Sequence, residues 1–320
     1  MSQFVLLCVT VCLATTALLL VVGTILAQVS WISLRRKGLD RRILHCPCLL
    51  FLVRTLPLSL PAAVTFLAVL PSFLKLEPRQ TAEKPEWWVV GLSLFSVLVG
   101  TIFVLRVAMI LARTSQVRRA LLCRARRLDV SSPIPAYAVA TPDSIFAVVG
   151  ILRPRLFIGQ RVLDCLTCEE LQAAIAHEIG HVQAFDNLKQ VILRAIRVPR
   201  LLAASDRALL DAAEIAADRR ALRNQISPLD LGEAIIKVAR LNASPVLAAT
   251  AASHLVPELD SSALRVRVEH IQSALEERSQ QVRKVLLYPW IAGLALLILY
   301  LVKLPLWLAL THRVTELLVR

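Results

Sequence analysis

Residues 171–186 read LQAAIAHEIGHVQAFD, and this stretch carries the most informative pattern in the chain. On a helix, His177 and His181 lie four residues apart and project from one face, with Cβ atoms about 5–6 Å apart. Two imidazoles at that spacing can bind one tetrahedral metal ion, and Glu178 beside them can act as a general base. The alternative is a pair of histidines on an ordinary amphipathic helix. Because the chain has only six histidines in 320 residues, we favour a zinc site.

The residues around this pattern predict the helix itself. Thr167 and Glu170 have the spacing of a capping box, which would start a helix at this point. Apolar residues then recur at helical spacing, at Leu171, Ala174, Ile175 and Ile179. We therefore place the two histidines on a helix.

A second segment, residues 211–220, reads DAAEIAADRR and is also helical in pattern. A catalytic zinc site needs a third protein ligand and an open position, and Glu214 would supply that ligand. Asp218, one turn further on, could accept the second N–H of a ligating imidazole. The alternative is a solvated helix face on which both acids pair with Arg219 and Arg220.

Together these motifs resemble the membrane-embedded gluzincin peptidases, which include HtpX-type heat-shock proteases and CAAX prenyl proteases. The likeness in layout is greatest to the protease domain of BlaR/MecR-type antirepressors. The resemblance covers residues 135–272. It rests on the segments 146–154, 169–171, 177–188 and 214–218, and more weakly on 267–271.

The resemblance implies an α+β zinc-protease domain that binds one zinc ion per chain. His177, His181 and Glu214 would be the zinc ligands, and Glu178 the base.

It also assigns supporting roles around those ligands. Asp186 and Asp218 would each hold a ligating histidine in one tautomer. Arg267 would support either the active-site carboxylates or the developing oxyanion, and the sequence leaves both open.

Short β-like runs precede the histidine helix, at residues 136–140, 145–149 and 156–158. In such enzymes an edge strand beside the metal can hold the substrate as an added strand. The candidate for that edge strand consists of Phe146, Ala147, Val148 and Val149. A core strand is the alternative.

Composition indicates an integral membrane protein, since 57% of residues are apolar and the mean hydropathy is +0.64. The fold class expected is an α-helical membrane protein with about four transmembrane helices and an α+β gluzincin domain. Three helices, at 4–29, 43–74 and 87–111, would lie in residues 1–113. The protease domain would occupy 114–284, followed in 285–320 by a fourth span and a short tail. We read the first run as a retained anchor rather than a signal peptide, because it lacks a basic start and a cleavage site.

The net charge of +14 gathers beside the apolar runs, at residues 35–42 and 113–127. This distribution indicates membrane topology rather than direct nucleic-acid binding. It predicts a multi-pass protein of the inner (plasma) membrane, with the protease domain in the cytoplasm and both termini outside. Membrane lipid is an expected partner at the basic residues 113–127. A helix over residues 188–204 could also lie on the membrane surface, and a core helix is the equally compatible alternative.

The sequence therefore predicts a membrane-bound zinc endopeptidase that hydrolyses peptide bonds with metal-activated water and Glu178 as base. Regulatory proteolysis of antirepressor type is the favoured role, with a protein or peptide such as a cytoplasmic repressor as substrate. Quality control of HtpX type and a catalytically silent zinc-binding membrane scaffold are the alternatives. No penicillin-binding domain follows the last run, so direct β-lactam sensing is not expected.

Overall fold

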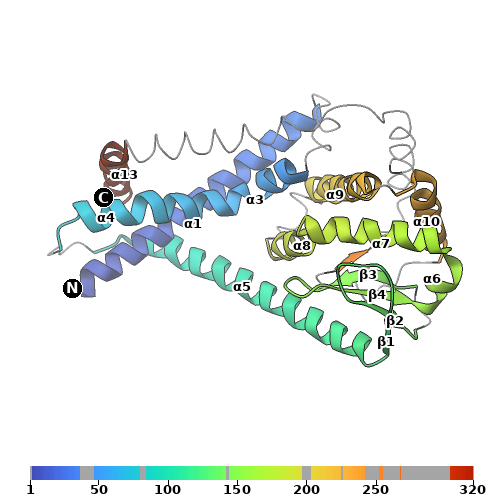
Figure 1. Cartoon of the computed structure of the whole chain (residues 1–320). Helices are drawn as coiled ribbons and strands as arrows, with labels where there is room; N and C mark the ends of the chain where they lie inside the picture. Colours follow the sequence, from blue (N-terminus) through green and yellow to red (C-terminus); the bar gives the residue numbers. More distant parts are fainter. Residues whose placement is uncertain are drawn as a thin grey trace. The chain divides into compact units, whose positions relative to one another are not determined.

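The computed structural model describes residues 2–36, 47–79, 84–141, 144–196, 203–224, 226–241, 252–254, 267 and 303–319 (Figure 1). The chain divides into two compact units. The helical unit comprises Met1–Arg36, Leu52–Phe103 and Ser279–Arg320, and the α/β unit comprises Lys37–Phe51 and Val104–Arg278.

The helices of the helical unit are long and apolar. They are α1 (Ser2–Arg36), α3 (Pro47–Val64), η1 (Thr65–Val69), α4 (Leu70–Leu76), the first part of α5 (Trp87–Leu122) and α13 (Leu304–Val319). In the part of the chain that the structure describes, three stretches could cross a membrane by length and composition, namely Gln3–Ser33, Arg54–Leu76 and Trp87–Leu122. These helices suggest a membrane protein. Most of the predicted fourth span lies outside the described residues, and residues 311–319, predicted as a tail, belong to α13.

The second of these stretches is not a continuous α-helix. Pro57 and Pro61 lie inside α3, and a π-helical turn, η1, follows before α4 begins. Prolines and π-helical turns are both recognised causes of an interruption in a helix. Arg54, in the same stretch, is buried.

The α/β unit is built on a five-stranded sheet. Its strands are β1 (Ala125–Leu128), β2 (Ala136–Val139), β3 (Phe146–Val149), β4 (Arg155–Gly159) and β5 (Ala252–His254). Their order is β1-β2-β4-β3-β5, with β2 and β4 parallel and the other pairs antiparallel. Neither β1 nor β5 was predicted. Strand β1 has no apolar alternation because Arg126 and Arg127 lie at its centre, and β5 has only three residues.

The prediction that Phe146, Ala147, Val148 and Val149 form an edge strand is wrong. They form β3, which pairs with β4 on one side and β5 on the other. All four residues are buried, as expected for a continuous apolar run without alternation. Among the described strands, β1 and β5 occupy the edges of the sheet.

Five helices follow β4 among the described residues of the α/β unit. They are α6 (Gln160–Cys165), α7 (Cys168–Gln183), α8 (Asp186–Ala195), α9 (Ala203–Arg223) and α10 (Pro228–Arg240). Figure 1 shows α7 between the sheet and α9. The predicted capping box is confirmed, because Thr167 Oγ1 accepts from the Glu170 N–H (3.3 Å) and Glu170 Oε2 accepts from the Thr167 N–H (2.9 Å).

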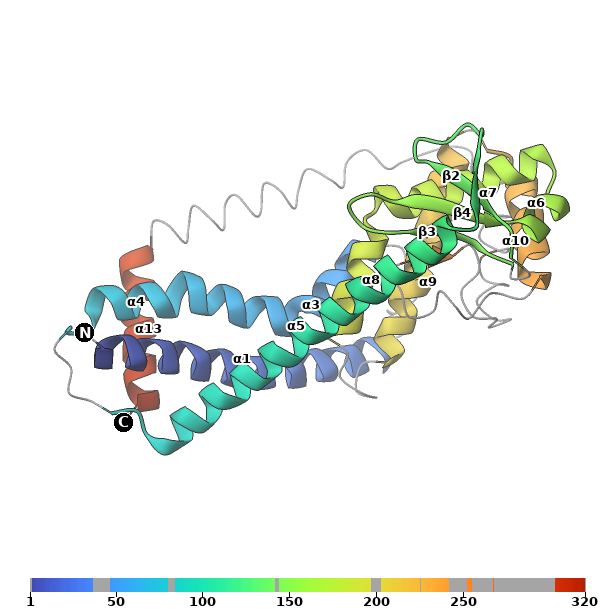
Figure 2. The same cartoon turned by 90° about the horizontal axis from the view of Figure 1, so that it is seen from below.

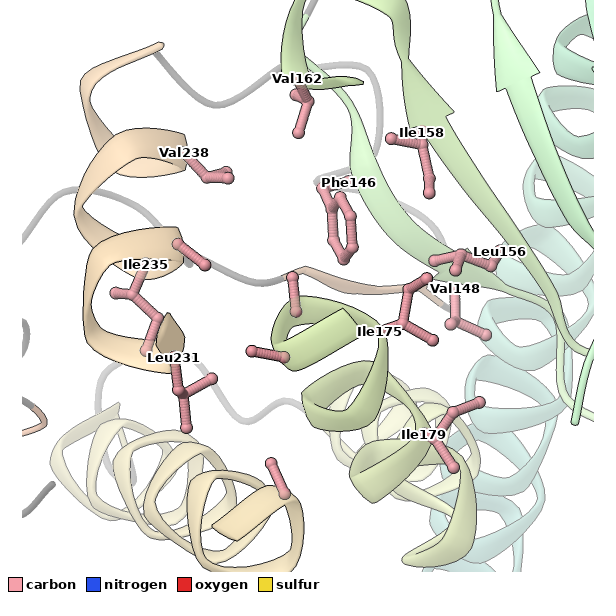
Figure 3. Close-up of a cluster of buried hydrophobic side chains, with 14 of the residues drawn as sticks. Phe146, Val148, Leu156, Ile158, Val162, Ile175, Ile179, Leu231, Ile235 and Val238 are labelled. Carbon is pink, nitrogen blue, oxygen red and sulfur yellow. The ribbon is translucent and has the colours of Figure 1, made fainter. Parts of the chain in front are cut away.

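One face of α7 is fixed in the main core (Figure 3). Ile175 and Ile179 lie against Val148 of β3 and Leu156 of β4, and Ile235 of α10 belongs to the same cluster. Each of these side chains is less than about a tenth exposed, and burial of such a side chain contributes about 1.5–3 kcal/mol. The sheet and α10 therefore hold α7 in a defined position, with its remaining face turned toward α9.

Candidate metal centre

His177 and His181 of the HEIGH segment, residues 177–181, project from α7 toward α9. His177 and Glu178 are fully buried and His181 is nearly so. Helix α9 brings Glu214 to the same place, and one ligand atom from each of His177, His181 and Glu214 lies within 4.8 Å of the others. The structure thus joins the three predicted ligands from two helices.

The distances show which atoms converge. The Nε2 atoms of His177 and His181 are 3.1 Å apart. The two carboxylate oxygens of Glu214 lie 3.4 Å from Nε2 of His177 and 3.5 Å from Nε2 of His181. Each imidazole therefore turns the same ring nitrogen toward a common point.

The other ring nitrogens meet carboxylates. Nδ1 of His177 lies 2.7 Å from an Asp218 oxygen, and Nδ1 of His181 lies 2.9 Å from an Asp186 oxygen. A carboxylate favours the tautomer that has its proton on Nδ1, and this leaves a lone pair on each Nε2. Two lone-pair nitrogens and a carboxylate then face one another. Three acceptors of this kind need a cation, and a His-His-Glu set is one that suits zinc.

Arg267 balances part of the negative charge. Its Nε and Nη2 donate to the two oxygens of Asp218 at 2.9 and 2.8 Å, and its Nη1 lies 3.1 Å from Glu214. The guanidinium is itself buried. Of the two roles that the sequence left open, these contacts match support of the carboxylates.

The pKa values of the site follow from these contacts. Burial raises the pKa of Asp218, but Arg267 and His177 lower it to about 2. Burial also raises the pKa of Glu214, yet Arg267 and His181 hold it well below the usual range. Both groups are therefore carboxylates at neutral pH. Burial lowers the pKa of His181, but Glu214 and Asp186 raise it to about 10, so the site strongly attracts positive charge.

Sequence reasoning missed the contact that lets α9 approach α7. A Cβ on Gly180 would lie 3.2 Å from the Cα and the carbonyl oxygen of Ala217, so only glycine fits at this crossing without a shift. Arg220 donates to the Gly180 carbonyl oxygen at 3.3 Å, so this arginine does not belong to a purely solvated face. The signal was a glycine inside a helix, one residue before a metal ligand.

Asn187 lies in the segment 177–188, which is part of the resemblance, and the structure gives this residue a defined role. Its Nδ2 donates to the carbonyl oxygens of Val148 (3.2 Å) and Gly150 (2.8 Å). Gly150 has a φ of +111°, a conformation that favours glycine. The start of α8, and with it Asp186, is thereby tied to the end of β3.

Among the described residues, no second group of metal-ligating side chains occurs, and Cys165 and Cys168 are free thiols.

Residues 111–251 match the family model described as Peptidase family M48. The match includes the whole of α7 and Glu214 and Asp218 of α9, and it stops before Arg267. A search of curated proteins found none that matches the chain. The family match supports an M48-type zinc metallopeptidase, and the three converging ligands offer a place for the metal.

Proposed function

We propose that the chain is a membrane-bound zinc endopeptidase of M48 type that acts in regulatory proteolysis, with a cytoplasmic protein such as a repressor as its substrate. The observation that carries the catalytic part is the convergence of His177, His181 and Glu214, with buried Glu178 next in sequence to the first ligand. The membrane part draws support from the three long apolar helices.

The residues of the site suit hydrolysis of a peptide bond. Zinc held by His177, His181 and Glu214 would supply Lewis-acid polarisation of the reactants. Glu178 takes a proton from the attacking water and passes it to the leaving nitrogen. Asp218, held by Arg267, keeps His177 in the ligating tautomer, and Asp186 does the same for His181.

The regulatory and topological parts draw support from the layout of the chain and from its charge. The layout resembles antirepressor proteases, in which a membrane unit is joined to a protease domain. The basic residues at 113–127 follow the apolar part of α5, which favours a cytoplasmic α/β unit with both termini outside. Quality control of HtpX type uses the same site chemistry and remains the second candidate.

The test is Glu178→Gln, because the amide keeps the shape of the side chain but cannot accept a proton. We expect hydrolysis of casein by the purified protein to fall by about 10²–10⁴-fold while bound zinc is unchanged. Glu169→Gln is the matched control, since it makes the same change at an exposed position of the same helix. Full activity of the Glu178 variant would remove this residue from the mechanism.

The same pair of variants tests the regulatory role in cells. Proteomic comparison of cells that carry wild type or Glu178→Gln should reveal one or a few fragments that disappear in the variant. A repressor among their parent proteins supports regulation, whereas a broad set of misfolded membrane proteins supports quality control.

A further inference from the structure

Helix α8 presents an apolar stripe on its more exposed side. Phe185 is 65% exposed and Leu188 is 40% exposed. Ile192 and Ile196 are half-buried and continue the same face at spacings of four residues. We call Phe185, Leu188, Ile192 and Ile196 the outer stripe. The buried residues of α8 are Asp186, Asn187, Val191, Leu193 and Ala195.

The backbone conformation of Phe185, at the start of the outer stripe, is unusual. Phe185 has a φ of 55°, in the left-handed region that a bulky side chain rarely occupies. Its ring gains little from the protein interior, because most of it is exposed. The loop after β3, which Asn187 ties to the start of α8, carries another exposed apolar side chain, Leu152 (95% exposed). A run of exposed apolar residues such as the outer stripe marks a surface that has a partner.

The far end of α8 is tied to the helix that is expected to cross the membrane. Arg106 of α5 donates through Nη1 to the carbonyl oxygen of Ala195 (3.4 Å), within the α/β unit, and α8 overlaps α5 in the view of Figure 2. Arg106 lies 19 residues after Trp87, where α5 begins, which corresponds to about 29 Å of helix. That length matches the hydrocarbon core of a bilayer, about 30 Å. On α5, Arg106 therefore lies near the end of the predicted membrane span, 87–111, and α8 contacts α5 at that point.

We propose that α8 is an interfacial helix whose outer stripe inserts into the headgroup region of the membrane that α5 crosses. The polar side of such a helix is typically basic, and Lys189 and Arg194 lie on α8. Because Asp186 begins α8 and contacts His181, the metal centre would lie within a few ångströms of the chain that touches lipid. Substrate segments close to the membrane surface would then be favoured. The proposal rests on α5 as a membrane helix and does not depend on peptidase activity.

The test measures where the outer stripe lies in reconstituted full-length protein. Single cysteines at Leu188 and, separately, at Phe185 are introduced in a background with the seven native cysteines replaced, and each carries an environment-sensitive fluorophore. The protein is placed in nanodiscs of phosphatidylcholine and phosphatidylglycerol. One quencher is a spin label on the lipid acyl chain near the headgroup, and the other is iodide in the buffer. Leu98 of α5 (57% exposed) is the membrane control and Leu229 of α10 (67% exposed) the aqueous control.

We expect the label at Leu188 to emit at shorter wavelength than the label at Leu229 and to be quenched by the lipid quencher, as expected about 5–10 Å below the surface. Phe185 should behave in the same way. Quenching by iodide alone would overturn the proposal, because the stripe would then face water. Protection from both quenchers would also overturn it, because a second copy or another protein segment would then cover the stripe.

Discussion

Near each end of α7 a buried carboxylate pairs with a cationic side chain, but the two pairs have different roles. At the N-terminal end, buried Glu170 accepts from Lys237 Nζ (2.5 Å) with one oxygen and from the Thr167 N–H (2.9 Å) with the other. At the C-terminal end, Arg267 pairs with Asp218 and Glu214, yet two imidazole nitrogens and Glu214 still converge as acceptors. At the N-terminal end each oxygen of the buried carboxylate has a donor, so the pair stabilises the fold. At the C-terminal end the acceptors outnumber the donors, so the same kind of pair leaves a site for a further cation.

The largest effect expected from this contrast follows Glu214→Ala. Removal of the third ligand should lower zinc affinity by more than the roughly 10–100-fold that loss of an outer partner costs, and activity should disappear with the metal. Zinc binding is measured by competition with a chelator. Glu170→Gln is the control at the other end of α7 and should keep wild-type zinc affinity. If the Glu214 variant retains zinc as wild type does, the third ligand lies elsewhere.

The next effect compares the two carboxylates behind the histidines. Asp218→Asn and Asp186→Asn should each weaken zinc binding, by about 10–100-fold, since an amide no longer favours a proton on Nδ1. The Asp218 variant should lose more. Its carboxylate is held by Arg267 from a buried position, whereas Asp186 pairs with Lys189, which is partly exposed. The same chelator titration ranks the two, and a larger loss for Asp186→Asn would reverse our assignment.

A smaller effect tests the close approach of α7 and α9. Gly180→Ala would place a methyl group 3.2 Å from backbone atoms of Ala217, so α9 must shift and carry Glu214 with it. We expect a loss of about 1–3 kcal/mol in the free energy of unfolding, together with weaker zinc binding. Gly232→Ala on α10 is the matched control, because nothing lies within 4 Å of its new Cβ. That variant should gain about 0.5–1 kcal/mol in stability and leave zinc affinity unchanged. Equal effects of the two substitutions would show that the crossing tolerates a side chain.

The smallest effect concerns the N-terminal end and depends on pH. Burial raises the pKa of Glu170, but the hydrogen bonds from Lys237 and the Thr167 backbone outweigh it and hold that pKa below its usual value. A carboxyl group with a lowered pKa stabilises the fold above its unfolded pKa of about 4.3, and the contribution is lost as the pH falls through the folded pKa. Lys237→Met should thus lower the melting temperature at neutral pH, and less so in acid.

The double variant Lys237→Met with Glu170→Gln controls this measurement, because it removes the charge that the single variant leaves behind. In the double variant this pair no longer titrates, so it should contribute no change in melting temperature over the same acid range. The expected shifts are modest, since Lys237 is a third exposed and water screens the pair. A pH-independent difference between wild type and Lys237→Met would show that the pair acts by packing alone.

Features that depend on local sequence were predictable. The capping box, the helix over the two histidines and the spacing of Glu214 and Asp218 all involve residues within one or two turns. The position of β3 was not, because its second neighbour, β5, lies about a hundred residues later in the chain. A three-residue strand leaves no pattern that could reveal this pairing.

The choice between the two roles of Arg267, and the crossing at Gly180, could not be predicted, for the same reason. Both depend on which side chains from distant helices face one another, and a sequence specifies those contacts only through the finished packing. The resemblance named Arg267, but only the packed structure shows that it pairs with the carboxylates of Asp218 and Glu214.

The separation between Asp218 and Arg267 has a consequence for the order of events during synthesis. The ribosome delivers His177, His181, Glu214 and Asp218 first, and Arg267 only 49 residues after Asp218. Until then the nascent α7 and α9 bring carboxylates together without the guanidinium that pairs with both in the finished protein. The time at which this arginine emerges therefore sets the earliest moment at which the centre can be completed.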